Sequence, residues 1–139
     1  EKLLSDLSEK TNIPVENIVN ALNSSNTNEV FTLAKRISKV YTTYILSNQL
    51  KYRTDYIKDN FDLRFFKKVF FSNEIGLKKP DMETFEFLLG EVHTVPEDCL
   101  FIDDNIENIK AAKELGINTI WFKDLEQLET KLKDFGIGY

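Results

Sequence analysis

The chain has 139 residues, of which 42% are hydrophobic, and a formal net charge of -5. This size and composition suit one domain with its own core. The negative charge and the lack of basic clusters among the aromatic residues argue against nucleic acid as a partner. No apolar run approaches the ~20 residues that a membrane-spanning helix needs. The single cysteine, Cys99, cannot form an internal disulfide. With no visible signal peptide, it favours a reducing, cytoplasmic setting.

Apolar residues recur with helical spacing through the first 39 residues, and alternating strands and helices follow. Helices are predicted at Glu1–Lys10, Pro14–Leu22, Glu29–Lys39, Gln49–Lys58, Asp81–Val92, Ile106–Leu115 and Leu125–Leu132, and strands at Val40–Leu46, Val69–Phe71, Cys99–Ile102 and Thr119–Phe122. Such alternation is typical of a parallel sheet covered on both faces. The prediction is an α/β fold, a Rossmann-like three-layer α/β/α sandwich with a partial helical cap.

Two adjacent carboxylates, Asp103 and Asp104, lie between the strand at Cys99–Ile102 and the helix that follows it. In open α/β sheets, ligands bind at the carboxyl ends of the strands. Neighbouring carboxylates repel each other, and a divalent cation with oxygen ligands removes that repulsion. The pair is therefore a candidate magnesium site.

Two further polar signals follow predicted strands: Ser47-Asn48 and Lys79-Pro80. A phosphate bound to magnesium needs hydroxyl and amide donors, a lysine as counter-charge and carboxylates for the metal. Pro80 biases Lys79 to an extended conformation, which can direct the lysine away from the following helix. All three signals can converge on one edge of the sheet.

Simpler interpretations exist for each signal. A Ser-Asn pair after a strand is common turn chemistry, Lys-Pro is common at exposed helix starts, and Asp is favoured at helix N-caps. The only histidine, His93, is interpreted as structural or incidental, and Trp121 as a core or rim residue.

The order of the three signals resembles the haloacid dehalogenase-like hydrolase superfamily. Ser47 in YILSN resembles its second motif, Lys79 in IGLKKPD the third, and Asp103 and Asp104 in FIDDNIENIKAAKELG the fourth. The resemblance covers about Val30 to Lys123. The most similar branch contains bacterial glucose-1-phosphate phosphatases and the phosphatase domain of soluble epoxide hydrolases. True haloacid dehalogenases carry Ser-Ser-Asn where this chain has Asp-Asp-Asn, so the acid pair indicates phosphate transfer.

The resemblance implies a Mg²⁺-dependent phosphohydrolase of a small phosphorylated metabolite, acting through an aspartyl-phosphate. Lys79 and Ser47 would be catalytic, Ser47 and Asn48 would hold the phosphoryl oxygens with Lys79, and Asp103 and Asp104 would bind Mg²⁺. The alternative is a non-catalytic, binding member of the superfamily. A phosphoacceptor receiver domain is disfavoured, because there the acid pair precedes the Lys-Pro.

The superfamily's first motif, Asp-x-Asp after a central strand, is not present ahead of Ser47. The expected organisation is a helical cap remnant over residues 1–28 and an α/β core over residues 29–139 that lacks its first strand. Losing a central strand would exceed the stability margin of a typical domain, so the chain is expected to be part of a longer protein. The strands ending at Leu46 and Ile102 should lie one strand apart, roughly 9–10 Å.

Overall fold

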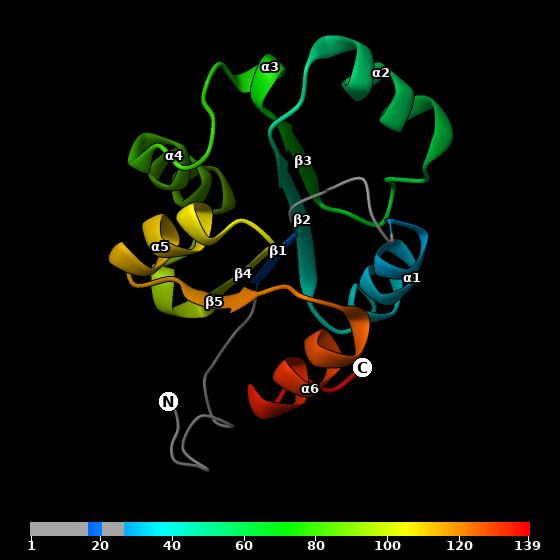
Figure 1. Cartoon of the computed structure of the whole chain (residues 1–139), viewed down its shortest axis with the longest axis vertical. Coiled ribbons are helices and arrows are strands. Elements are labelled where there is room, and N and C mark those ends of the chain that lie inside the picture. The colour runs from blue at the N-terminus through cyan, green and yellow to red at the C-terminus, as the bar shows by residue number, and fades with distance from the viewer. Residues whose placement is uncertain (1–16, 21–26) are drawn as a thin grey trace.

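The computed structural model describes residues 17–20 and 27–139, and their strands form one parallel five-stranded sheet in the order β3-β2-β1-β4-β5 (Figure 1). The strands are β1 (Asn17–Asn20), β2 (Thr42–Ser47), β3 (Lys68–Phe71), β4 (Cys99–Asp103) and β5 (Asn118–Trp121). The helices are α1 (Thr27–Ile37), α2 (Lys51–Asn60), α3 (Ser72–Ile75), α4 (Met82–Val92), α5 (Ile106–Glu114) and α6 (Leu125–Asp134), with a 3₁₀ turn η2 at Pro96–Asp98.

Helices cover both faces of the sheet, as predicted. Successive residues of a strand point to opposite faces. In β1, Val19 packs with the apolar sides of α4 and α5, and Ile18 packs with those of α1 and α6. The two helix pairs lie on opposite sides of the sheet in Figure 1. The predicted α/β three-layer sandwich is confirmed, and its core includes these two apolar layers and a smaller buried cluster around Phe31 and Ile45.

The strand β1 corrects the sequence interpretation. Residues 17–20 were predicted to lie in a helix of the cap remnant, but they pair in parallel with both β2 and β4. The sheet therefore has a central strand, contrary to the expectation of a core lacking it. The prediction that the strands ending at Leu46 and Ile102 do not pair directly is confirmed. Residues 1–16 and 21–26 of the predicted cap remnant lie outside the described residues, and its last two residues begin α1.

The other elements lie close to their predicted positions. One addition is α3, a single turn at Ser72–Ile75 within the segment predicted to be the loop before Pro80. Of the described helices, none is both long and apolar enough to cross a membrane. Because all the described strands are parallel, their carboxyl ends meet at one edge of the sheet, where the polar residues singled out above follow β2 and β4.

Candidate functional site

Asp103 is the last residue of β4, and its carboxylate is held by donors from three segments. Its side chain is only 2% exposed. Oδ2 accepts hydrogen bonds from Lys79 Nζ at 3.0 Å and from Asn108 Nδ2 at 2.8 Å, and Oδ1 accepts one from the backbone N–H of Asn105 at 2.9 Å. A carboxylate has about four acceptor positions, so these bonds fix its direction without exhausting its acceptor capacity.

Lys79 brings the second and third sequence signals to the acid pair. Its side chain is 4% exposed, and Nζ also donates to the carbonyl oxygen of Leu46 at 2.9 Å. Leu46 precedes Ser47, so the ammonium group links the carboxyl ends of β2 and β4, the two strands that flank β1. Burial lowers the pKa of Lys79, and the charges of Asp103 and Asp104 oppose that shift.

Asn48 holds the backbone of Lys79. Its Nδ2 donates to the Lys79 carbonyl oxygen at 2.9 Å, and its Oδ1 accepts from the Lys79 N–H at 3.0 Å. Both polar atoms of the carboxamide therefore position Lys79 in the loop before α4, directly before the cis peptide bond to Pro80. That Asn48 also holds phosphoryl oxygens stays a prediction.

We expect Asn48→Ala to lower the free energy of unfolding by about 1–3 kcal/mol, because two hydrogen bonds to one loop are lost. Chemical denaturation measures the change. The matched control is Asn60→Ala, which removes one exposed bond, from Nδ2 to the Tyr56 carbonyl oxygen at 2.8 Å, and should change stability by less than about 0.5 kcal/mol. Equal effects of the two substitutions would contradict the positioning role of Asn48.

Ser47 ends β2 and is fully buried. Its Oγ accepts a hydrogen bond from Gln49 Nε2 at 2.8 Å. The backbone N–H of Gln49 in turn donates to Ser72 Oγ at 2.9 Å, which connects this turn to the start of α3. The hydroxyl therefore lies at the predicted edge of the sheet, and its bond from Gln49 uses an oxygen lone pair rather than the O–H donor.

Asp104 differs from its neighbour because it is exposed. Its partial desolvation and its interactions with the Asp103 carboxylate raise the pKa of Asp104, while Lys79 lowers it. Two carboxylates that interact in this way form a site where a cation would relieve the repulsion.

Helix capping does not explain the acid pair. The N-cap of α5 is Asn105, whose Oδ1 accepts from the backbone N–H of Glu107 at 2.9 Å. Asp103 and Asp104 lie before that cap. The alternative in which the pair exists to start the helix therefore accounts for neither carboxylate.

The donor set around Asp104 fits Mg²⁺ in part. Mg²⁺ usually keeps several waters and is held by one or two carboxylates together with phosphate oxygens. Asp104 is exposed, and the Asp103 carboxylate retains acceptor capacity beside it. Within the described part of the chain, no three His, Cys, Asp or Glu side chains gather as a metal cluster. The pair could therefore supply two ligands to a bound Mg²⁺, and further ligands would come from water or phosphate.

No acidic residue follows the central strand. The sequence continues from Asn20 with Ala21, Leu22 and Asn23, and it contains no Asp or Glu between Asn17 and Asn28. The carboxyl end of β1 therefore does not carry the Asp-x-Asp pattern, although its strand occupies the expected position in the sheet.

Sequence reasoning missed two side chains that contact the acid pair. Asn108 was detectable, because it is a polar residue on the buried side of α5 beside Ile109 and Ala112. Trp121 was interpreted as packing, but its Nε1 donates to the carbonyl oxygen of Asp104 at 3.0 Å. Nothing in the sequence near Trp121 indicates that bond.

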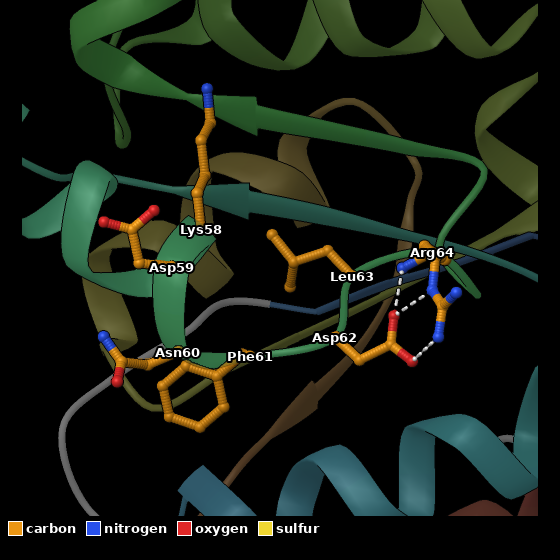
Figure 2. A pocket seen from close by; sticks show the side chains of 7 residues that line it. All are labelled: Lys58, Asp59, Asn60, Phe61, Asp62, Leu63 and Arg64. Carbon is orange, nitrogen blue, oxygen red and sulfur yellow. Dashed lines mark hydrogen bonds and ion pairs between the residues drawn. The ribbon is translucent and has the colours of Figure 1, made fainter.

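A surface hollow of about 710 Å³ lies away from this cluster, between α2 and β3. Figure 2 shows its lining, Lys58 to Arg64, with the Asp62–Arg64 ion pair at one side. That pair is exposed, and exposed ion pairs contribute little to stability or binding. The hollow contains no buried charged side chain, so the volume alone does not make it a functional site. His93 lies in another hollow and ends α4 in a left-handed conformation, φ 57°.

The comparison with known families decides the identity of the fold. Residues 9–122 match the family model described as haloacid dehalogenase-like hydrolase. The chain belongs to that family. The resemblance found from the three motifs is therefore confirmed, while the particular branch stays a prediction.

Curated relatives of the haloacid dehalogenase-like chain include phosphatases. It is 40% identical over 52 residues to a D-ribitol-5-phosphate phosphatase of Bacteroides thetaiotaomicron. The aligned residues cover 37% of this chain and 25% of the relative. It is 38% identical over 63 residues to a chloroplast flavin mononucleotide hydrolase of Arabidopsis thaliana, covering 45% and 26%. The chain spans less than a third of the length of these relatives.

Solved structures share the haloacid dehalogenase-like fold. A family enzyme from Bacteroides thetaiotaomicron, in complex with magnesium and inorganic phosphate, has a TM-score of 0.67 at 26% identity, covering 78% of this chain and 58% of that one. An uncharacterised protein from Corynebacterium glutamicum has a TM-score of 0.72 at 20% identity, covering 90% and 98%. The second likeness concerns the fold alone.

Proposed function

We propose that this chain supplies the phosphate- and metal-binding half of a Mg²⁺-dependent phosphatase site that acts on a small phosphorylated metabolite. The observation that carries the proposal is the buried pair of Lys79 and Asp103, 3.0 Å apart, which links the carboxyl ends of β2 and β4 beside Ser47. A buried ion pair at the ligand-binding edge of an α/β sheet is a typical feature of functional sites. The phosphatases among the relatives, and a neighbour that binds magnesium and phosphate, support it.

Each residue has a distinct task in the proposed site. The Lys79 ammonium would neutralise phosphoryl charge in a low-dielectric setting, where electrostatic stabilisation is strong. The Ser47 hydroxyl would donate its proton to a phosphoryl oxygen while its oxygen accepts from the Gln49 carboxamide. Asp104 would bind Mg²⁺ directly, with Asp103 bound directly or through water. The metal, when bound, would supply positive charge that draws electrons from the phosphoryl group.

Turnover also needs a carboxylate that takes the phosphoryl group, and residues 21–28, directly after β1, include none. We therefore propose that the nucleophile belongs to the rest of the whole protein. The run Ala21-Leu22-Asn23 after the central strand favours a second candidate, a non-catalytic member that binds a phosphorylated ligand without cleaving it.

One experiment separates the two candidates. Calorimetry on this chain should detect inorganic phosphate in the presence of Mg²⁺, while release of phosphate from p-nitrophenyl phosphate should be undetectable. The whole protein should hydrolyse the ester if it carries the nucleophile. Binding without turnover in the whole protein would favour the non-catalytic candidate.

A matched variant tests the assignment of the phosphate side. Ser47→Ala should weaken phosphate binding by about 3- to 10-fold, the equivalent of one hydrogen bond, and should leave the affinity for Mg²⁺ alone unchanged. If neither phosphate nor Mg²⁺ binds to the chain, both candidate functions are rejected for this site.

A further inference from the structure

Trp121 contacts the acid-pair loop from the end of the neighbouring strand. The register of β5 places Trp121 opposite Asp103. The backbone N–H of Phe122 donates to the Asp103 carbonyl oxygen at 2.8 Å, and the indole N–H of Trp121 donates to the next carbonyl oxygen, that of Asp104, at 3.0 Å. The side chain therefore continues the hydrogen bonding of the sheet by one residue, past the point where β4 ends.

This bond acts on the segment whose direction matters for a ligand. Asp104 is the exposed carboxylate of the pair, and its carbonyl group precedes Asn105, the N-cap of α5. The backbone of the pair is thus fixed on one side by β5 and on the other by the bond from the Asn105 N–H to Asp103 Oδ1. An indole that left its place would release the carbonyl group of Asp104 from the sheet.

Two contacts hold Trp121, one to its ring and one to its backbone. Lys123 Nζ lies 3.7 Å from the centroid of the Trp121 ring, a cation–π geometry. Gln127 Nε2 donates to the Trp121 carbonyl oxygen at 3.1 Å, which ties the end of β5 to α6. Trp121 is nevertheless 41% exposed, so burial of apolar surface alone does not explain the orientation of its ring.

We propose that Trp121 is a positioning residue that sets the direction of the Asp104 carboxylate toward a bound cation. This role rests on the proposed function, in which Asp104 binds Mg²⁺. Trp121 would not contact the metal itself and would act only through Asp104. It also implies that the indole, the only tryptophan in the chain, reports on events at the acid pair through its fluorescence.

Hydrogen exchange tests the positioning without any ligand. Trp121→Phe removes the N–H donor and keeps an aromatic ring, and the amide of Asn105 should then exchange about 2- to 10-fold faster. Lys123→Met keeps the N–H donor and removes only the cation–π contact, so the Asn105 rate should rise less than it does in Trp121→Phe. Both variants should leave the rates of core amides, such as that of Leu88, unchanged. A benzothiophene analogue of tryptophan, with sulfur in place of the N–H, should reproduce Trp121→Phe with the shape retained. An unchanged Asn105 rate, or an equal increase at Leu88, would overturn the proposal.

Magnesium binding distinguishes this inference from the function on which it rests. Residues that orient a metal ligand typically change metal affinity by 10- to 100-fold, so calorimetry with Mg²⁺ should show a loss of about 10-fold for Trp121→Phe and a smaller loss for Lys123→Met, which keeps the N–H donor. Mg²⁺ should change the indole emission of the unmodified chain but not that of Asp104→Asn. If the unmodified chain binds Mg²⁺ and Trp121→Phe binds it equally, the positioning role is wrong and the proposed function stands. If the unmodified chain binds no Mg²⁺, the proposed function fails and the role in directing a cation ligand fails with it.

Discussion

Lys79→Met is expected to lower the free energy of unfolding by about 3–5 kcal/mol, because it leaves Asp103 buried without its counter-charge. The two side chains are only 4% and 2% exposed, so water cannot replace the ammonium group without opening the site. The Leu46 carbonyl oxygen loses its donor as well. Domains are typically stable by only about 5–15 kcal/mol, so the loss would be visible as a large shift of the urea midpoint.

The double variant Lys79→Met with Asp103→Asn serves as the control. Because both charges are then absent, the double variant should lose much less stability than the sum of the two single losses. Such non-additivity is expected for residues in direct contact. Additive losses would mean that the pair is not the source of the effect. Lost turnover in a Lys79 variant would therefore not be evidence for catalysis by itself, because the same change lowers the stability of the fold.

Asp103→Asn has a pH dependence of known sign. Burial already lowers the pKa of Lys79 in the folded chain, and Asp103 is the main group opposing this shift, so its removal should lower that pKa further. Between the lowered folded pKa of Lys79 and the ordinary lysine value of 10.5, the unfolded chain then binds more protons than the folded chain, and stability rises with pH. The destabilisation by Asp103→Asn should therefore be greatest at neutral pH and smaller in alkaline buffer.

The sequence predicted much of the core because the four strands after Val40 are strongly apolar and are separated by amphipathic helices. The strand predicted at Cys99–Ile102 is one residue shorter than β4, which ends at Asp103, because the apolar pattern stops at that first charge. Three short polar signals were sufficient to predict the site edge, because parallel strands bring their carboxyl ends together. The order of these signals, rather than any one of them, indicated the family.

The prediction failed at β1 for a reason of periodicity. Val15, Ile18, Val19 and Leu22 follow helical spacing, and Pro14 favours a helix start, whereas the strand contains only two apolar residues. Ile18 and Val19 are fully buried on opposite faces of the sheet, and a buried segment this short has no alternating pattern to detect. Tertiary position, which the sequence pattern does not encode, decides its structure.

The site's supporting bonds were equally hidden. The bond from Trp121 to Asp104 depends on the register of β5 against β4, and the Asn48 contacts depend on how the loop before α4 returns to β2. Both join residues far apart in the chain. The sequence could indicate which side chains carry chemistry, but not which side chains hold them.

Asp104→Asn is expected to abolish Mg²⁺ binding and, in the absence of metal, to make the chain slightly more stable at neutral pH. Desolvation and the neighbouring Asp103 carboxylate raise the pKa of Asp104 in the folded chain. An acid whose pKa is raised on folding contributes stability below its unfolded value of 3.8, and that contribution is lost as pH rises through the folded value. An asparagine does not titrate, so the stability of Asp104→Asn should rise relative to that of the unmodified chain as pH increases from mildly acidic to neutral.

Mg²⁺ should reverse this order of stability, so that the unmodified chain becomes more stable than Asp104→Asn. A ligand that binds only the folded state stabilises it by RT ln(1 + [L]/Kd), so Mg²⁺ should raise the melting temperature of the unmodified chain and not that of Asp104→Asn. The loss of affinity should be at least the 10- to 100-fold typical of residues that merely orient a ligand, because Asp104 is proposed to contact the metal itself. Glu107→Gln, a neighbouring exposed acid on α5, is the matched control and should keep the Mg²⁺ response. If Asp104→Asn retains that response, the acid pair is not the metal site, and the raised pKa reflects only the repulsion between two neighbouring carboxylates.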